Sequence, residues 1–304
     1  MDVNSVQETI ERLVQEVGEK VVGLGRGWGM GSGVVVAQDR VLTCAHNLRG
    51  DEPTVTFGDG RRETATVAGV DEDRDLAVLD VATGDVEAVN WEPEEADVRI
   101  GSPVVAIANP DGRGLRATLG FSSSGERWFR GPRGRRLRGA IEHTAPLPRG
   151  SSGAPLLDPA GRLLGINAVR LDGGLILALP ADAATKKRVE LLARGERPSA
   201  RRLGLAIAPP RAARRMRRAV GLPERSGLLV RAVEEDGPAG RAGVERGDLV
   251  VGAAGEEIDG IDALHAVLDG LQEGASLDLS LVRGTDERSV SVEFGSAEPA
   301  APAG

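Results

Sequence analysis

The chain has 304 residues, of which 40% are hydrophobic and 28% charged, and its net charge is −8. This length allows two or three domains, and the acidic balance argues against a nucleic-acid-binding or anionic-membrane-binding protein. With a single cysteine, no signal peptide pattern at the N-terminus and no apolar run of membrane-spanning length, the sequence predicts a cytoplasmic protein, unless the N-terminus is incomplete and the protein is exported.

The first part of the chain changes from a helical to a strand pattern. Residues 5–17 are predicted to form an amphipathic helix, because Ser5 and Glu8 fit a capping box and apolar residues recur on one face. From residue 21 onward, many short apolar segments separated by turns favour an all-β barrel or sandwich. The arginine-rich stretch 122–138 is predicted to be a polar, mobile loop, because it lacks the pattern of a nucleic-acid-binding fold.

The second part of the chain begins with another helix. Residues 181–194 are predicted to be helical, with Gly195 ending the helix. After a basic linker, short strands and a helix at about 261–271 indicate a second, smaller α+β domain. The final residues, 296–304, are rich in Ala and Pro and are expected to be a disordered tail.

Small residues surround Ser152 in the stretch Gly150–Pro155. Glycine lets the backbone bend and lets a substrate carbonyl approach, and such a turn can aim backbone N–H groups at one point, as an oxyanion hole requires. Taken alone, this signal is weak, because Gly/Ser clusters are usually ordinary turns. Its interpretation therefore depends on a histidine and an aspartate in suitable places.

His46 and Asp75 supply these two residues. His46 ends an apolar strand, and Asp75 opens the apolar segment Leu76–Leu79. An aspartate that enters a buried strand needs a partner, because an unpaired buried carboxylate is costly, and an imidazole would provide one. The order His46, Asp75, Ser152 is one of the known orders of Ser-His-Asp catalysis. In this hypothesis Ser152 is the nucleophile, His46 the base and Asp75 its orienting partner.

These motifs together resemble those of HtrA/Deg-type serine proteases. Residues 43–46 are similar to the T-A-A-H box, 75–79 match D-L-A-V-L, and 150–156 are similar to G-N-S-G-G-P-L. The resemblance covers about residues 20–295. It implies a mostly β fold, a chymotrypsin-like double β-barrel followed by an α+β PDZ domain, and an ATP-independent endopeptidase for unfolded or misfolded protein, without metal or cofactor. Relatives form trimers, so a homo-oligomer is one implied state.

The implied organisation has five segments. They are an N-terminal amphipathic helix at 1–19, a protease domain at 20–180, a helix and linker at 181–199, a PDZ domain at 200–295 and the tail at 296–304. The backbone N–H groups of Gly150 and Ser152, with Ser151 between them, would form the oxyanion hole. The chain departs from the family pattern at Thr144, Arg149 and Ala154. Ala154 would crowd the strand if its φ were positive.

The pocket for the residue before the cleaved bond is assigned to Pro146, Leu147 and Ala168. It lacks a carboxylate at its base, so cleavage after small or aliphatic residues is expected. In the PDZ domain, the carboxylate-binding loop is assigned to Arg201, Arg202, Leu203, Gly204 and Leu205, and the groove helix to Ala263, Leu264 and Val267. The expected partners are therefore unfolded proteins and peptide C-termini. The alternative is a catalytically silent, peptide-binding or chaperone-like module.

Overall fold

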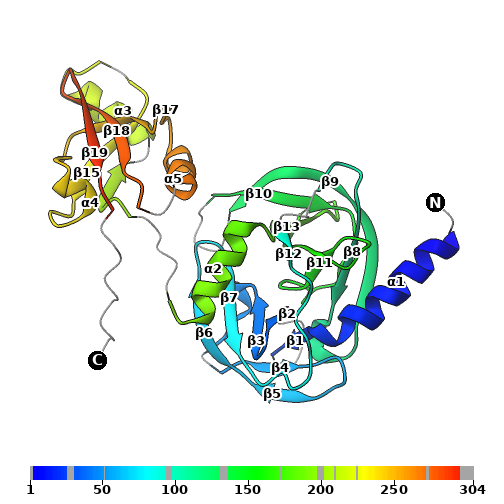
Figure 1. Ribbon diagram of the computed structural model, residues 1–304. Coiled ribbons are helices and arrows are strands. Elements are labelled where there is room, and N and C mark those ends of the chain that lie inside the picture. The colour runs from blue at the N-terminus through cyan, green and yellow to red at the C-terminus, as the bar shows by residue number, and fades with distance from the viewer. Residues whose placement is uncertain are drawn as a thin grey trace. The chain divides into compact units, whose positions relative to one another are not determined.

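The computed structural model describes residues 3–25, 31–50, 52–93, 98–130, 136–171, 173–196, 202–208, 210–223, 225–271 and 274–294. The chain separates into two compact units, residues 1–198 and 199–304 (Figure 1). The predicted tail and Arg201 lie outside the described residues. Among the described helices, none combines the length and the apolar character that crossing a membrane requires.

One half of the first unit is a seven-stranded antiparallel sheet, in the order β5-β4-β1-β2-β3-β7-β6. Its strands are β1 (Val21–Leu24), β2 (Gly31–Ala37), β3 (Arg40–Thr43), β4 (Thr54–Thr56), β5 (Arg62–Thr64), β6 (Thr66–Asp71) and β7 (Leu76–Asp80). β-Branched residues dominate the central strands, and their side chains are almost completely buried, as in Val34, Val35 and Val41. The paired ends of β3 and β7 hold two of the site residues discussed below.

The second half of the first unit is a closed barrel in the order β10-β13-β12-β11-β8-β9. Its strands are β8 (Pro103–Ala108), β9 (Arg116–Arg130), β10 (Arg136–His143), β11 (Pro155–Leu157), β12 (Leu163–Arg170) and β13 (Ile176–Pro180). The prediction of a loop at 122–138 is wrong, because β9 and β10 pair as a long hairpin through much of it. Polar residues are tolerated on such strands where their side chains pair from one strand to the other. Arg127 Nε, for example, lies 2.8 Å from Glu142 Oε2.

The sheet and the barrel share one hydrophobic core. Leu42 and Val78 from the sheet belong to the same buried cluster as Ile107, Leu157 and Ile166 from the barrel. Aliphatic side chains fill this core, which agrees with a sequence that has only 2% aromatic residues. The shared packing fixes loops of the sheet against loops of the barrel.

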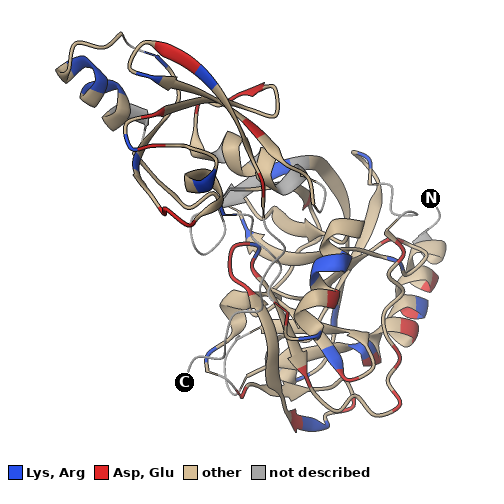
Figure 2. Cartoon of the chain, turned by 60° about the vertical axis from the view of Figure 1, so that its left-hand side comes forward, with Lys and Arg blue, Asp and Glu red and all other residues tan. Residues whose placement is uncertain are grey.

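Two helices close the first unit. α1 (Val3–Val17) begins two residues earlier than predicted, so Ser5 lies inside the helix, where its carbonyl accepts a hydrogen bond from Thr9 Oγ1. The predicted capping box is therefore wrong. Leu13 and Val17 bury the apolar face of α1 in the shared core, and the opposite face carries charged residues (Figure 2).

Helix α2 (Ala183–Ala193) packs on β6 and β7. It begins where the Asp182 side chain accepts a hydrogen bond from Thr185 N at 2.8 Å, a normal N-cap. Val189 and Leu192 place it in the shared core, so α2 is part of the first unit and does not stand in the connection between the two units.

The second unit contains a sheet in the order β14-β15-β16-β18-β19, with β17 paired to β16. The strands are β14 (Leu205–Ala208), β15 (Leu228–Val233), β16 (Leu249–Ala253), β17 (Glu256–Glu257), β18 (Leu277–Arg283) and β19 (Asp286–Val292). The helices are α3 (Pro210–Ala219), α4 (Pro238–Arg241) and α5 (Ile261–Gly270). β14 lies at the edge of the sheet, so one side of its backbone is free of strand partners among the described residues.

A buried ion pair fixes the turn before β16. Asp248 is fully buried and binds Arg283 through two hydrogen bonds of 2.7 and 2.8 Å. Burial alone would raise the pKa of Asp248, but the hydrogen bonds from Arg283 and from the Glu245 N–H outweigh it and lower the pKa. This ion pair explains why an aspartate, Asp248, directly precedes β16.

Candidate active site

The pairing of β3 with β7 brings His46 next to Asp75. Thr43 at the end of β3 is opposite Ala77 near the start of β7, so residues just after β3 meet residues just before β7. His46 lies in the 3₁₀ turn η2 (Ala45–Asn47), and Ala45 N donates to Asp75 O at 3.1 Å. Two residues that are 29 positions apart in the sequence therefore meet through sheet register alone.

Asp75 binds the histidine with both carboxylate oxygens. Oδ2 lies 2.7 Å from His46 Nδ1, and Oδ1 accepts a hydrogen bond from the His46 backbone N–H at 3.0 Å. The Asp75 side chain is 1% exposed and the His46 side chain 36% exposed. Asp75 also has a φ of 56°, a left-handed conformation that Asp tolerates better than most residues. The imidazole is therefore held by a buried carboxylate and remains open to solvent.

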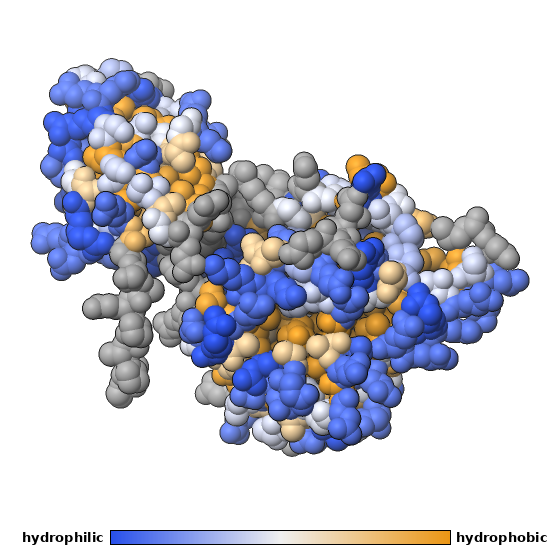
Figure 3. All heavy atoms as spheres, viewed as in Figure 1, coloured by the Kyte–Doolittle hydropathy of each residue, from blue (hydrophilic) through white to orange (hydrophobic). Residues whose placement is uncertain are grey.

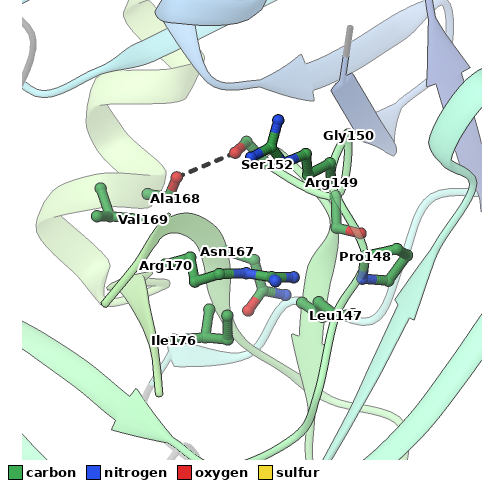
Figure 4. Close-up of a pocket in the computed structure, with 11 residues that line it drawn as sticks. Leu147, Pro148, Arg149, Gly150, Ser152, Asn167, Ala168, Val169, Arg170 and Ile176 are labelled. Carbon is green, nitrogen blue, oxygen red and sulfur yellow. Dashed lines mark hydrogen bonds between the residues drawn. The ribbon is translucent and has the colours of Figure 1, made fainter. Parts of the chain in front are cut away.

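Ser152 lies in the loop that precedes β11 and is partly exposed. Its Oγ donates a hydrogen bond to the Ala168 carbonyl at 3.0 Å (Figure 4). No hydrogen bond joins it to His46 in the part of the chain that the structure describes. The nucleophile candidate is thus in the loop where the sequence predicted it, but its hydroxyl points to β12.

Two residues that sequence reasoning missed hold this loop against the sheet. Ser32, in β2, donates from its N–H to Ser152 O at 2.8 Å and from its hydroxyl to Gly150 O at 3.0 Å. Asn47, directly after His46, donates from Nδ2 to Ser152 O at 2.8 Å. Their sequence signals were the Gly-Ser-Gly that opens β2 and the polar residue beside the histidine. Ser32 and Asn47 therefore connect the serine loop to the elements that hold His46.

The predicted oxyanion donors are free to receive a ligand. The N–H groups of Gly150 and Ser152 have no acceptor among the described backbone groups, and Gly150 has a φ of 84°. Ala154, which raised a concern about crowding, is fully buried and is not among the described residues with positive φ. Its side chain packs in an apolar cluster with Leu156 and Leu164, so the barrel accommodates this departure.

A cavity of about 360 Å³ lies beside Ser152. Leu147 and Ala168, both predicted, line it together with Val169 and Ile176. Pro146 does not: it is exposed and outside the lining, so its assignment to the pocket is wrong. The side chain of Arg170, which the sequence analysis missed, extends across the cavity in Figure 4.

Cys44 lies behind the His46–Asp75 pair. Burial, and then the charge of Asp75, raises the pKa of this thiol well above its ordinary value of 9.0. Its sulfur and the side-chain ligand atoms of His46 and Asp75 lie within 4.8 Å of one another, a spacing that a metal ion could use. However, a metal needs a thiolate, and Asp75 already binds the histidine, so these residues do not form a good metal site.

His143 is a buried histidine that the sequence did not single out. Asn167 Nδ2 donates to Ala154 O, so Asn167 Oδ1 faces His143, whose Nε2 donates to it at 2.7 Å. Burial lowers the pKa of His143 below its ordinary value of 6.5, although the bond to Asn167 acts in the opposite direction. The neutral ring is therefore part of the barrel core beneath the cavity residue Asn167.

The His143 pKa predicts a loss of stability in acid. Below pH 6.5 the unfolded chain binds a proton at this histidine that the folded chain does not, so the free energy of unfolding falls as the pH falls. The slope from one such group is at most about 1.4 kcal/mol per pH unit. Urea unfolding at pH 7 and pH 5 should show a steeper loss for the wild type than for His143→Gln; equal losses would contradict the prediction.

In the second unit, the residues predicted to bind a peptide differ in how accessible they are. The N–H groups of Leu203 and Gly204 lack acceptors among the described backbone groups, and β14 begins at Leu205. Arg202 is exposed, and its Nη2 lies 3.6 Å from Glu234 Oε1. The Leu203 side chain packs in the core cluster of this unit. The loop thus presents two N–H donors next to an open strand edge.

The helix assigned to the groove is only partly available. Leu264 and Val267 are 2% and 8% exposed and belong to the core cluster, whereas Ala263 is partly exposed at its edge. Ile261, at the start of α5, is 39% exposed, and apolar surface lies beside α5 in Figure 3. Of the three residues assigned to the groove, Ala263 is therefore the most exposed.

Comparisons with known proteins agree with this architecture. Residues 31–166 match the trypsin-like peptidase domain model, and residues 203–294 match the PDZ domain model. The chain is 31% identical over 273 residues to the "Probable periplasmic serine endoprotease DegP-like" of Halomonas elongata, covering 88% of this chain and 56% of that protein. It is 30% identical over 287 residues to "Protease Do-like 1, chloroplastic" of Arabidopsis thaliana, covering 87% and 63%.

A solved structure titled "HtrA-type protease AlgW with decapeptide" has the same fold, with a TM-score of 0.75 and 23% identity, covering 95% of this chain and 99% of that one. The fold and the site therefore define a trypsin-like peptidase domain followed by a PDZ domain. The chain is similar to HtrA/DegP-type proteases, and within it a PDZ domain follows the peptidase domain. It spans about half the length of the first curated relatives that it matches.

Proposed function

We propose that this chain is an ATP-independent serine endopeptidase that hydrolyses unfolded or misfolded protein. The observation that carries the proposal is the buried Asp75 carboxylate, which binds His46 at 2.7 Å beside a serine loop anchored to the same sheet. A buried aspartate that fixes one imidazole nitrogen leaves the other as an acceptor, and this is the arrangement that activates a serine hydroxyl.

The proposed reaction begins with rotation of the Ser152 side chain. Its Oγ leaves the Ala168 carbonyl and turns to His46 Nε2, which takes the proton as Oγ attacks the substrate carbonyl. The N–H groups of Gly150 and Ser152 bind the oxyanion, and each such donor contributes about 3–4 kcal/mol in related sites. His46 then donates its proton to the leaving amine, and a water molecule hydrolyses the acyl-enzyme by the same steps.

Casein digestion without ATP tests the proposed activity. We expect the wild-type chain to degrade casein and to leave a folded globular protein of similar size intact. Ser152→Ala should abolish the digestion, because it removes the nucleophile. If both proteins digest casein at the same rate, the activity belongs to a contaminant or to another residue.

One observation favours the alternative, a catalytically silent binding module. Ser152 Oγ bonds to Ala168 O and not to His46, an arrangement in which the base cannot take its proton. In that case casein would bind without being cut, and Ser152→Ala would bind it equally well. The digestion therefore decides between the two functions on the same pair of proteins.

We also propose that the PDZ domain binds peptide C-termini. The free N–H groups of Leu203 and Gly204 suit a carboxylate, and the open edge of β14 suits an added strand. In support, the AlgW structure with a decapeptide is a peptide complex by its title. The oligomeric state stays a prediction for a native mass measurement. The cytoplasmic location also stays a prediction, because the Halomonas relative is named periplasmic.

Peptide amidation tests the carboxylate site. Full-length Ser152→Ala protein should bind a fluorescent peptide that ends in a free apolar residue at least about tenfold more tightly than the amidated peptide, because the amide has no charge to share between the two N–H groups. Arg202→Gln should change the affinity little, since Arg202 is exposed and near Glu234. Equal anisotropy curves for the free-acid and the amidated peptide would mean that this loop does not bind the peptide carboxylate.

A further inference from the structure

The cavity beside Ser152 carries positive charge that the HtrA-type resemblance did not lead us to expect. Its apolar walls come from Leu147, Ala168 and Ile176, but Arg149 and Arg170 also line it, and no described Asp or Glu does. Arg149 directly precedes the oxyanion loop, and Arg170 ends β12, two residues after the carbonyl that Ser152 contacts. Both arginines are therefore lining residues of the cavity next to the nucleophile.

Neither arginine has an ion pair or hydrogen bond within the ranges that the structure describes. Other arginines of the same unit do: Arg127 binds Glu142, Arg162 binds Asp158 and Arg188 binds Asp71, each at 2.6–2.8 Å. A guanidinium presents several N–H donors in a planar fork that matches a carboxylate. The two arginines of the cavity are exposed and, like the exposed Arg49 and Arg113, have no protein partner among the described residues, so their donors are available to a ligand.

The side chain of Arg170 lies along the cavity. In Figure 4 its side chain runs across the cavity below Ala168 and Ser152, toward Leu147 on the opposite wall. Ser151, another lining residue, is 4% exposed, and its hydroxyl lacks a hydrogen-bond partner among the described groups. Arg170 and Ser151 add polar recognition to a pocket whose remaining walls accept aliphatic groups.

We propose that this cavity selects an acidic residue, glutamate above all, immediately before the cleaved bond. The proposal rests on the proposed peptidase function, because the side chain of that residue must enter the cavity beside the serine that attacks its carbonyl. The carboxylate pairs with Arg170, and its methylene groups lie against Leu147 and Ile176. Glutamate reaches farther than aspartate, lysine is repelled by both arginines, and valine fits the walls without gaining an ion pair.

Matched peptides measure this preference directly. Four fluorogenic peptides that differ only in Glu, Gln, Val or Lys before the scissile bond are compared by kcat/KM. The Glu/Gln pair differs almost only in charge, so its ratio isolates the arginines. We expect Glu to exceed Gln by roughly tenfold or more, as for a charge-assisted pair that substrate shields from water. A preference for Val or Lys over Glu would overturn the proposal.

Arginine variants assign the preference to its residue. Arg170→Gln should bring the Glu/Gln ratio close to one, and Arg170→Glu should make Lys the better substrate than Glu. Arg113→Gln is the matched control, since Arg113 is exposed and outside the cavity lining, and it should leave the ratio unchanged. If the Glu/Gln ratio survives in Arg170→Gln, Arg170 does not set the specificity.

A serine-directed fluorophosphonate probe distinguishes a failure of the proposed peptidase function from a failure of the proposed acidic preference. A preparation that the probe does not label, and that cuts none of the peptides, contradicts the proposed peptidase function itself. A preparation that is labelled and cuts after Val or Lys but not after Glu contradicts only the acidic preference. Mapping the cuts in denatured casein gives a second readout of the same preference, in which a majority after Glu or Asp supports it.

Discussion

Replacing Asp75 by asparagine should lower turnover by up to about 10⁴-fold without unfolding the protein. Asparagine keeps an oxygen for the His46 backbone N–H, and it tolerates the left-handed backbone that Asp75 adopts. Its NH₂ group, however, would face His46 Nδ1 and favour the tautomer with the proton on Nε2. In that tautomer the histidine cannot take the proton of Ser152.

Peptide kcat and thermal unfolding check this prediction together. The matched control is Asp85→Asn, because Asp85 is an exposed carboxylate of the same unit and should tolerate the change in both measurements. A folded Asp75→Asn protein that keeps more than about a tenth of wild-type turnover would mean that Asp75 does not orient the base.

Gly153→Ala should produce the largest loss of stability among the single changes considered. Gly153 has a φ of 90°, and an added Cβ would lie 2.0 Å from Ser32 O and 2.5 Å from Thr43 Oγ1. The serine loop would have to leave the strand that holds it. The left-handed strain and the overpacking together are expected to cost about 3 kcal/mol or more, with loss of activity.

Gly60→Ala isolates the strain from the collision. Gly60 has nearly the same φ, 89°, but no atom of the described residues lies within 4 Å of an added Cβ. It should therefore lose only about 1–2 kcal/mol in urea unfolding and keep full activity. If the two variants unfolded at the same urea concentration, the contact between Gly153 and Ser32 would not be rigid.

The candidate triad could be predicted from the sequence because each residue has a local signature. His46 follows an apolar strand, Asp75 precedes one, and Ser152 stands between glycines. Their meeting depends on the register of β3 with β7 and on the Ser32 contact, which no local pattern reveals. Sequence reasoning therefore identified the residues but not the orientation of the Ser152 hydroxyl.

The errors have physical causes that local patterns do not reveal. Arginines in 122–138 suggested a loop, whereas cross-strand pairs such as Arg127 with Glu142 allow a hairpin there. Pro146 was placed in the pocket by its distance from Ser152 in the sequence, but its side chain faces solvent. Arg170 was missed because the direction of a side chain at a strand end depends on the whole barrel. Helix α3 was missed because its many arginines resembled a linker.

Covalent labelling of Ser152 tests the central claim most directly. A fluorophosphonate reacts with a serine only where a base activates its hydroxyl, so it reports the His46–Ser152 relationship without requiring a known substrate. Intact mass and peptide mapping of the wild-type chain should show one adduct, on Ser152. The adduct should be absent from Ser152→Ala and from His46→Ala. A wild-type protein that stays unlabelled, or an adduct that persists in Ser152→Ala, would contradict the account.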